Sequence, residues 1–396
     1  MRRFTTGVVL FACVSVVAPA KAELGVIVEG QRQVFPSGGN APLSAAVKAD
    51  GLIYVSGALS AKGDIKEQTQ GVLNSLGQSL TKAGSSLQHV VAATVYLKNA
   101  ADAAAMTEVW RATWPKDPPT RTTIVADFVV PNALVEIAVI AVPTGGERVI
   151  VHPAGWSTAN PYSHAIRSGD TLFISGQVSR DPKSNQPVDG DVTTQVKTIF
   201  ANTEEILKTA GFTLADIVAN RVYLTDVNTF GEMNKAYVPN FPKNPPARAT
   251  VIVGLPGPQY KVELTPTAVR GPKEVITTPG PDGSPGKPSA TLSSAIKVGN
   301  RLYVAGILGN NATNKGDVEA QTAEAMARIE RTMKAAGFSF ADLVDAVVYI
   351  TDASYFQAMN NAYRAAIGKD FPARATVKTG LVGQEGLVEI MFVASK

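Results

Sequence analysis

The hydrophobic pattern of the chain changes period in a regular way and predicts alternating strands and helices. A short apolar run at residues 172–176 is typical of a buried strand. Apolar residues then recur at three- and four-residue spacings over 192–207, which predicts an amphipathic helix, and Gly211 is typical of the residue that ends one. An alternating, β-branched stretch at 217–224 predicts a second strand, and a shorter helix is expected over 230–237.

Two more strands are predicted after these elements, at residues 247–253 and 261–269. The segment between them is rich in glycine and proline, which predicts a hairpin. In such a hairpin Arg248 and Glu263 would lie roughly across from each other and point to one face. Strands with two helices on one face give an α+β fold.

This pattern occurs three times along the chain. Five residue types recur with internal steps of 16, 12, 25 and 15, and the copies are set about 125 residues apart. The recurring positions are Gln68, Gly84, Tyr96, Arg121 and Glu136, then Gln195, Gly211, Tyr223, Arg248 and Glu263, then Gln321, Gly337, Tyr349, Arg374 and Glu389. A chain of 396 residues with 45% hydrophobic content can build three ordinary cores. We therefore predict three tandem domains, at residues 23–146, 147–271 and 272–396.

The N-terminal segment differs from the rest of the chain. Arg2 and Arg3 precede an apolar run over residues 8–18, and residues 20–22 have the small-x-small form of a signal-peptidase site. The run is shorter than the roughly 20 residues that a spanning helix needs. Residues 1–22 are therefore predicted to be a signal peptide, and the mature protein to be periplasmic or secreted, with no integral membrane segment.

Cleavage would also change the chemistry of the chain. Cys13 is the only cysteine, so the mature protein would contain no disulfide, thiol nucleophile or cysteine-bound metal. Loss of Arg2, Arg3 and Lys21 would leave 34 basic residues against 33 acidic ones, a balance that argues against nucleic-acid binding. The three histidines show no metal-ligand spacing, and neither a metal nor an organic cofactor is expected.

Several short segments resemble the RidA/YjgF family of enamine/imine deaminases. They fall in family order at residues 162–166, 174–177, 246–251 and 262–264, and the Pro-x-Arg-x-x-Val element at 246–251 is the most specific. The resemblance implies a chorismate-mutase-like α+β unit, with a mixed sheet and two helices on one face. It also implies a trimeric assembly with a cleft at each interface. In a fused chain, this becomes an intramolecular pseudo-trimer that is expected to be monomeric.

The resemblance extends unequally to the three copies. The second copy carries the fullest set and is predicted to be catalytic through Tyr162, Ser175, Gly176, Arg248 and Glu263. The first copy has a leucine, Leu43, at the tyrosine position, and it keeps Ser56, Gly57, Arg121 and Glu136. The third copy has Leu292 and Ala305 for the tyrosine and serine, and it keeps Gly306, Arg374 and Glu389. The sites in copies one and three are therefore expected to be degenerate.

These residue types suit the hydrolysis of a small carboxylate-bearing imine. A planar guanidinium offers two parallel donors to the carboxylate of a 2-imino acid. A glutamate can deprotonate water for attack on the imine carbon and then help to protonate the departing ammonia. The tyrosine and serine hydroxyls can hold the substrate and the water. A glutamate beside the arginine should have a lowered pKa.

Three functions remain open at this point. The first is deamination of small 2-imino or 2-enamine acids to 2-oxo acids and ammonia, with Arg248 as the expected anchor. The second is a non-catalytic exported protein that binds a small carboxylate or holds damaged proteins, which Leu43, Leu292 and Ala305 favour. The third is an endoribonuclease, which the charge balance disfavours. Separately, Pro266 is expected to bend or bulge the last strand of the second copy.

Overall fold

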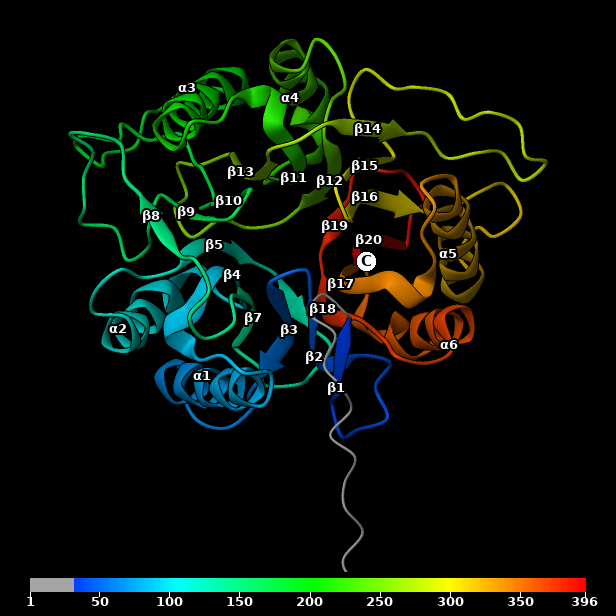
Figure 1. Ribbon diagram of the computed structural model, residues 1–396, viewed down its shortest axis with the longest axis horizontal. Coiled ribbons are helices and arrows are strands. Elements are labelled where there is room, and N and C mark those ends of the chain that lie inside the picture. The colour runs from blue at the N-terminus through cyan, green and yellow to red at the C-terminus, as the bar shows by residue number, and fades with distance from the viewer. Residues whose placement is uncertain (1–31) are drawn as a thin grey trace, which may run out of the picture.

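The computed structural model describes residues 32–396, which form three α+β domains arranged in a ring (Figure 1). Each domain has one mixed sheet with two helices on its outer face, and the inner faces of the sheets meet at the centre. The predicted fold class of three tandem α+β domains is confirmed. The predicted signal peptide at residues 1–22 lies outside the described residues.

Each sheet is built mainly from one third of the chain. The first domain contains β1 (Gln33–Pro36), β2 (Ser44–Ala49), β3 (Leu52–Leu59), α1 (Ile65–Lys82), β4 (Val90–Leu97), α2 (Ala103–Thr113), β5 (Thr120–Val125), β6 (Asp127–Phe128) and β7 (Val135–Ala141). The second contains β8 (Val149–Val151), β9 (Ala165–Ser168), β10 (Thr171–Ile174), α3 (Val192–Ala210), β11 (Ile217–Leu224), α4 (Phe230–Tyr237), β12 (Ala247–Ile252) and β13 (Val262–Val269). The third contains β14 (Lys273–Ile276), β15 (Ala295–Val298), β16 (Arg301–Leu308), α5 (Val318–Ala335), β17 (Leu343–Ile350), α6 (Phe356–Ile367), β18 (Ala373–Lys378), β19 (Gly380–Leu381) and β20 (Val388–Ser395).

The first helix of every domain begins at an aspartate. The side chains of Asp64, Asp191 and Asp317 each accept a hydrogen bond from a backbone amide of the first turn. At the other end of α3, Gly211 adopts the left-handed conformation that the sequence predicts for a helix stop, with φ of 74°. In the part of the chain that the structure describes, no helix is both long and apolar enough to cross a membrane.

The predicted hairpin between residues 247–253 and 261–269 is wrong. β12 and β13 are not neighbours, because β11 lies between them and pairs in parallel with β12 and antiparallel with β13. The helix α4 makes the crossover that two parallel strands require. The other two domains repeat this order, with β4 between β5 and β7 and β17 between β18 and β20.

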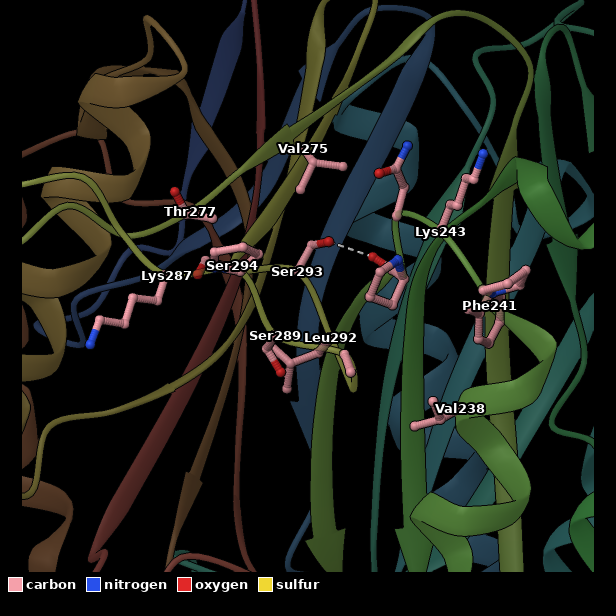
Figure 2. Close-up of a pocket in the computed structure, with 15 residues that line it drawn as sticks. Val238, Phe241, Lys243, Val275, Thr277, Lys287, Ser289, Leu292, Ser293 and Ser294 are labelled. Carbon is pink, nitrogen blue, oxygen red and sulfur yellow. Dashed lines mark hydrogen bonds between the residues drawn. The ribbon is translucent and has the colours of Figure 1, made fainter.

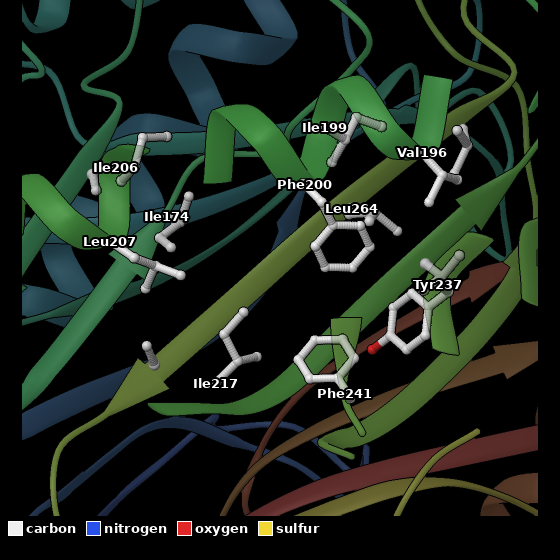
Figure 3. Close-up of a cluster of buried hydrophobic side chains, with 14 of the residues drawn as sticks. Ile174, Val196, Ile199, Phe200, Ile206, Leu207, Ile217, Tyr237, Phe241 and Leu264 are labelled. Atoms are coloured by element: carbon white, nitrogen blue, oxygen red, sulfur yellow. The ribbon is translucent and has the colours of Figure 1, made fainter. Parts of the chain in front are cut away.

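Each domain encloses its own hydrophobic core between the helices and the sheet. In the second domain, Ile199 and Phe200 of α3 pack over Leu264 of β13 (Figure 3). Phe200, Tyr237 and Phe241 form an aromatic group with ring centroids 5.0–5.7 Å apart. This packing fixes α4 on the sheet and thereby fixes the position of Tyr237.

The recurring glutamine of each copy fastens the loop that leads to the recurring glutamate. The amide of Gln195 donates to the Gln259 carbonyl at 2.9 Å and accepts from the Lys261 amide at 2.8 Å. Gln68 and Gln321 make the same two bonds in their own domains. A buried side chain with both hydrogen bonds satisfied holds the start of the glutamate strand in place.

The three domains exchange short strands in a closed cycle. β19 of the third domain pairs with β12 of the second, and β6 of the first pairs with β18 of the third. Gly254 of the second domain bridges Val125 at the edge strand of the first. One edge of each sheet, at β5, β12 or β18, is thus covered by a neighbouring domain.

The centre of the ring is a shared apolar core. It contains the recurring tyrosines Tyr96, Tyr223 and Tyr349, all fully buried, one from each domain. Residues of β5, β12 and β18 pack around them, so the strands that carry the recurring arginines form the inner walls between domains.

Pro266 affects the neighbouring strand more than its own. β13 runs without a break from Val262 to Val269, but β10 ends at Ile174, whereas its counterparts β3 and β16 continue for four more residues. Phe173 still pairs with Thr267, and the next contact is an isolated bridge between Gln177 and Leu264. The missing amide of Pro266 therefore loosens the ladder on its β10 side instead of bending β13.

Candidate functional site between domains one and two

Each recurring arginine meets the recurring glutamate of the next domain around the ring. The Arg121 cleft lies between domains one and two and contains Arg121, Tyr162, Ser175, Gly176 and Glu263. The Arg248 cleft lies between domains two and three and contains Arg248, Leu292, Ala305, Gly306 and Glu389. The Arg374 cleft lies between domains three and one and contains Arg374, Leu43, Ser56, Gly57 and Glu136.

The predicted catalytic set is therefore divided between two clefts. Tyr162, Ser175 and Glu263 lie with Arg121, which was expected to belong to a degenerate site, and Arg248 faces the third domain. The register explains the separation, because Arg248 pairs with Asn220 on β11 and Glu263 pairs with Tyr223, three residues further along. Residues an odd number apart on a strand point to opposite faces of the sheet. Arg248 and Glu263 therefore lie on opposite faces.

The side chain of Arg121 is held between aromatic rings of two domains. Its guanidinium carbon lies 5.2 Å from the Trp110 ring centroid on α2 and 5.6 Å from that of Tyr162 in the second domain. One terminal nitrogen donates to the Thr107 hydroxyl at 3.3 Å. Trp110 is itself fixed by a 2.7 Å hydrogen bond to the Pro161 carbonyl, next to Tyr162. The arginine is thus oriented before any ligand arrives.

Ser175 is a positioning residue at the domain interface. Its hydroxyl donates to the Ser163 carbonyl at 2.7 Å and accepts from the Arg121 backbone amide at 2.9 Å. The amide of Gly176 then donates to the Arg121 carbonyl at 3.1 Å. We expected this hydroxyl to hold substrate or water; in the structure one of its bonds goes to the strand of Arg121 and the other to Ser163 in its own domain. Ser56 makes the same bonds to Ser44 and Arg374.

Gly176 leaves room for the carboxyl of Glu263. A Cβ added to Gly176 would collide with the Glu263 Oε1 atom, and it would lie 3.2 Å from the Thr122 Cα atom across the interface. Gly57 and Gly306 have the same relation to Glu136 and Glu389. A glycine is required at this position because the carboxyl occupies the space of a side chain.

Burial, not ion pairing, decides the protonation of Glu263. The side chain is 4% exposed, and burial raises its pKa to about 8, against the opposing effects of the Thr123 backbone hydrogen bond and the Arg121 charge. Within residues 32–396, no ion pair joins Glu263 to an arginine. The expected net lowering of this pKa is therefore wrong, because burial outweighs the lowering that the Arg121 charge causes.

Arg121 stays a cation despite its surroundings. Burial lowers its pKa to about 10, and Tyr162 and Glu263 partly offset that effect. Its side chain keeps some contact with solvent, whereas Arg248 and Arg374 are each only 2% exposed. Of the three arginines, Arg121 is thus the most exposed to solvent.

The other two clefts are closed around their arginines. The guanidinium of Arg248 lies 4.8 Å from the Tyr237 ring centroid, and that of Arg374 lies 4.9 Å from that of Tyr363. Leu292 and Ala305 bring no hydroxyl to the Arg248 cleft and instead belong to an apolar interface cluster. Of the residues predicted to form degenerate sites, Arg121 thus lies with Tyr162, and the others line the Arg248 and Arg374 clefts.

Tyr162 separates two hollows beside the Arg121 cleft. A cavity of about 30 Å³ lies between Tyr162, Gly176, Gln177 and Arg180. A wider groove of about 360 Å³ opens on the other side, lined by Trp114, Asn160, His152 and His164 among others. Both hollows border Tyr162, and neither Arg121 nor Glu263 is among the residues that line them.

His164 does not share a strand face with Tyr162. Both residues precede β9, and the His164 Nε2 atom lies 3.0 Å from the Ser157 carbonyl. Its ring stacks on His152 at 5.3 Å and meets Trp156 edge-on at 4.9 Å. Burial lowers its pKa, so it acts as a neutral packing residue in the wall of the groove.

The interface of domains two and three has a pocket of about 390 Å³, whose lining residues are drawn in Figure 2 and do not include Arg248. Phe241, Val275 and Leu292 contribute apolar surface to it, and Ser293 donates to the Pro245 carbonyl at 2.5 Å along its wall. The side chains of Lys243 and Lys287 point in different directions in Figure 2. Without converging polar groups, this pocket is a weaker candidate than the Arg121 cleft.

The fold and the clefts define a class of α+β protein in which an arginine and a glutamate from adjacent domains face a shared interface. Residues 38–143, 154–270 and 284–396 each match the family described as Endoribonuclease L-PSP. The chain therefore belongs to this family, with three copies of its domain in tandem. This confirms the resemblance to RidA/YjgF proteins that the sequence shows.

Some similar proteins match a single domain of this chain, and one solved structure matches most of its length. The human 2-iminobutanoate/2-iminopropanoate deaminase is 37% identical over 125 residues, which cover 32% of this chain and 91% of the relative. The RidA crystal structure from the Antarctic bacterium Psychrobacter sp. is 31% identical, covers 31% of this chain and 100% of its own, and has a TM-score of 0.29. A chorismatase crystal structure matches 78% of this chain and 93% of its own, with a TM-score of 0.50 and 14% identity, which shows a shared fold alone.

Proposed function

We propose that this protein hydrolyses small 2-imino acids, and their enamine tautomers, to 2-oxo acids and ammonia in the Arg121 cleft. One observation carries the proposal. This cleft combines a partly exposed arginine with the Tyr162 hydroxyl and a buried glutamate that holds a proton near neutral pH. The relatives named as 2-iminobutanoate/2-iminopropanoate deaminases support the choice of substrate class.

Arg121 anchors the substrate carboxylate. Its guanidinium is planar and can donate two parallel hydrogen bonds, and the flanking rings of Trp110 and Tyr162 restrict its motion. Its pKa of about 10 keeps it protonated at neutral pH. The carboxylate is thus held in one orientation, with the imine carbon beside Glu263.

Glu263 serves first as an acid and then as a base. The neutral carboxyl gives its proton to the imine nitrogen, which makes the imine carbon more electrophilic, and the resulting carboxylate accepts a proton from the attacking water. The product is a carbinolamine. Glu263 then protonates the amino group, the carbon–nitrogen bond breaks, and the hydroxyl proton returns to Glu263 as the 2-oxo acid and ammonia leave. Atoms and charge balance without any other reactant.

A pKa near 8 suits this double role. A group whose pKa lies close to the working pH donates and accepts protons with similar ease. Imines already hydrolyse in water, so orientation and modest acid–base assistance suffice for a useful acceleration. This explains how a site with few polar side chains can be catalytic.

Under this proposal, the Arg248 and Arg374 clefts are not catalytic and act only as structural interfaces between domains. Their arginines are almost fully buried, and their leucines, Leu292 and Leu43, replace the tyrosine of the Arg121 cleft. The hydrophobic contacts that close these clefts hold neighbouring domains together. One chain would then carry one working site on a scaffold of three domains.

The test is ammonia release from 2-iminopropanoate, which an amino-acid oxidase forms in situ from alanine. The wild-type protein should release ammonia faster than the buffer control, and Glu263→Gln should slow this release by about 100-fold or more, in the range that general acid–base catalysis contributes. Glu389→Gln is the matched control, because it makes the same change in the Arg248 cleft. Release no faster than buffer, or equal losses in both variants, would refute the proposal.

A further inference from the structure

A second arginine of domain two lies beside the Arg121 cleft and has no role in the proposed chemistry. Arg180 lines the cavity of about 30 Å³ that also contacts Tyr162 and Gly176. Burial raises the pKa of Tyr162, and the charges of Arg180 and then Arg121 oppose this rise, so both cations act on the same hydroxyl. Tyr162 therefore has a guanidinium on the side of the first domain and another within its own domain.

Arg180 is held rigidly by its own loop. One terminal nitrogen donates to the Tyr260 hydroxyl at 2.7 Å, and the other donates to the Asn185 side-chain oxygen at 2.9 Å. Its carbonyl accepts from Asn202 of α3 at 2.8 Å. Its Nε atom is buried and has no hydrogen-bond partner among residues 32–396. A fixed guanidinium with a free donor loses little entropy when it binds an anion.

The two other copies lack this arrangement. Counting four residues from the cleft glycine, as from Gly176 to Arg180, leads to Ala61 in the first copy and Asn310 in the third. Counting three residues back from the glutamate, as from Glu263 to Tyr260, leads to Ala133 and Gly386. The arginine and its tyrosine partner occur together, and they occur beside the one cleft that keeps Tyr162.

The charges of the cleft do not balance without a ligand. Arg121 and Arg180 are cationic, whereas burial raises the pKa of Glu263 to about 8 and leaves it mostly neutral at pH 7. Among the described residues, no acidic side chain lines the cavity next to Arg180. A substrate with one carboxylate would neutralise one of the two cations, and a substrate with two would neutralise both.

We infer that the Arg121 cleft prefers 2-imino dicarboxylic acids, with the first carboxylate on Arg121 and the second, at the end of the substrate side chain, toward Arg180. The inference rests on the proposed function, and it assigns Arg180 as a specificity-determining residue. The reaction is the same hydrolysis: water replaces the imine nitrogen, and a 2-oxo dicarboxylic acid and ammonia are formed. The substrate would be supplied by oxidation of an acidic amino acid.

The test compares kcat/KM for three imines that oxidases form in situ: 2-iminoglutarate, 2-iminosuccinate and 2-iminopropanoate. The wild-type protein should favour at least one dicarboxylic imine over 2-iminopropanoate by about 10-fold or more, the effect of one charge-assisted hydrogen bond. Arg180→Gln should lower this preference by about 10- to 100-fold. Arg167→Gln is the control, since Arg167 pairs with Glu147 away from the cleft and should leave the ratio unchanged.

Binding of products provides a second measurement that needs no catalysis. By calorimetry, 2-oxoglutarate should bind the wild-type protein at least about 10-fold more tightly than 2-oxobutanoate, and this difference should vanish in Arg180→Gln. Hydrolysis of 2-iminopropanoate without a dicarboxylate preference would overturn the inference and leave the proposed function standing. Failure to hydrolyse any imine would overturn the proposed function, and the inference with it. Should Arg180→Gln fold poorly, Arg180→Lys and the wild-type binding ratio still decide the question.

Discussion

Replacement of the three recurring arginines by methionine separates the Arg121 cleft from the other two. Methionine is unbranched, so it keeps much of the apolar length of arginine and removes the charge and all the donors. Arg121→Met should reduce kcat/KM for 2-iminopropanoate strongly. Arg248→Met and Arg374→Met should leave it within about twofold, because these two side chains are 2% exposed and turned onto Tyr237 and Tyr363.

The size of the effect follows from the bonds that are lost. A hydrogen bond to a charged group contributes about 1.5–3 kcal/mol, so two parallel bonds to a carboxylate contribute about 3–6 kcal/mol. Arg121 is partly exposed, and solvent weakens its bonds toward the lower limit. At about 1.4 kcal/mol for each factor of ten, kcat/KM should fall by at least about 100-fold. Most of the change should appear in KM if the carboxylate is bound equally in the ground and transition states.

The melting temperatures of Arg248→Met and Arg374→Met show whether these variants remain folded when their activity is compared. Arg248 and Arg374 are buried with unpartnered guanidinium nitrogens, in the part of the chain that the structure describes. Exchanging such a buried charge for an apolar side chain is often neutral or stabilising, so neither variant should lower the melting temperature greatly. Retained activity in Arg121→Met together with lost activity in Arg248→Met would refute our assignment and place the reaction between domains two and three. Equal activity in all three variants would refute arginine anchoring altogether.

Four further predictions test other parts of the structure. Burial raises the pKa of Glu389 from its usual 4.5 to about 8. The stability that the bound proton supplies is therefore complete below about pH 4.5 and is lost as the pH rises to about 8. Glu389→Gln should raise the melting temperature at pH 8.5 and not at pH 4. Ser175→Ala should lower the free energy of unfolding by about 1–3 kcal/mol, because it leaves the Arg121 backbone amide buried without its partner. An unchanged midpoint of denaturant unfolding would contradict the positioning role of Ser175. Gly176→Ala should displace the Glu263 carboxyl and reduce ammonia release by about 10-fold or more, whereas full activity would show that the carboxyl position is not critical. Light scattering should give one chain per particle, since the inner edge of each sheet is already covered within the ring, and three chains per particle would contradict this.

The sequence by itself determined the repeat and the secondary structure. The amphipathic period of α3, its stop at Gly211 and the alternation of β11 depend on neighbouring residues, and local patterns record these preferences directly. The resemblance also picked out residue types that do lie in clefts. Spacing alone did not show why Gln195 recurs, because its partners lie 64 and 66 residues away.

The tertiary structure alone decided which residues share a cleft. A step of 15 residues between Arg248 and Glu263 fits a hairpin, but β11 enters between their strands and turns the two side chains to opposite faces. The glutamate of one domain then meets the arginine of the preceding one, so Arg121 and not Arg248 joins Tyr162. The protonation state of Glu263 could not be predicted from the sequence either. Its pKa depends on burial, which only the assembled ring creates.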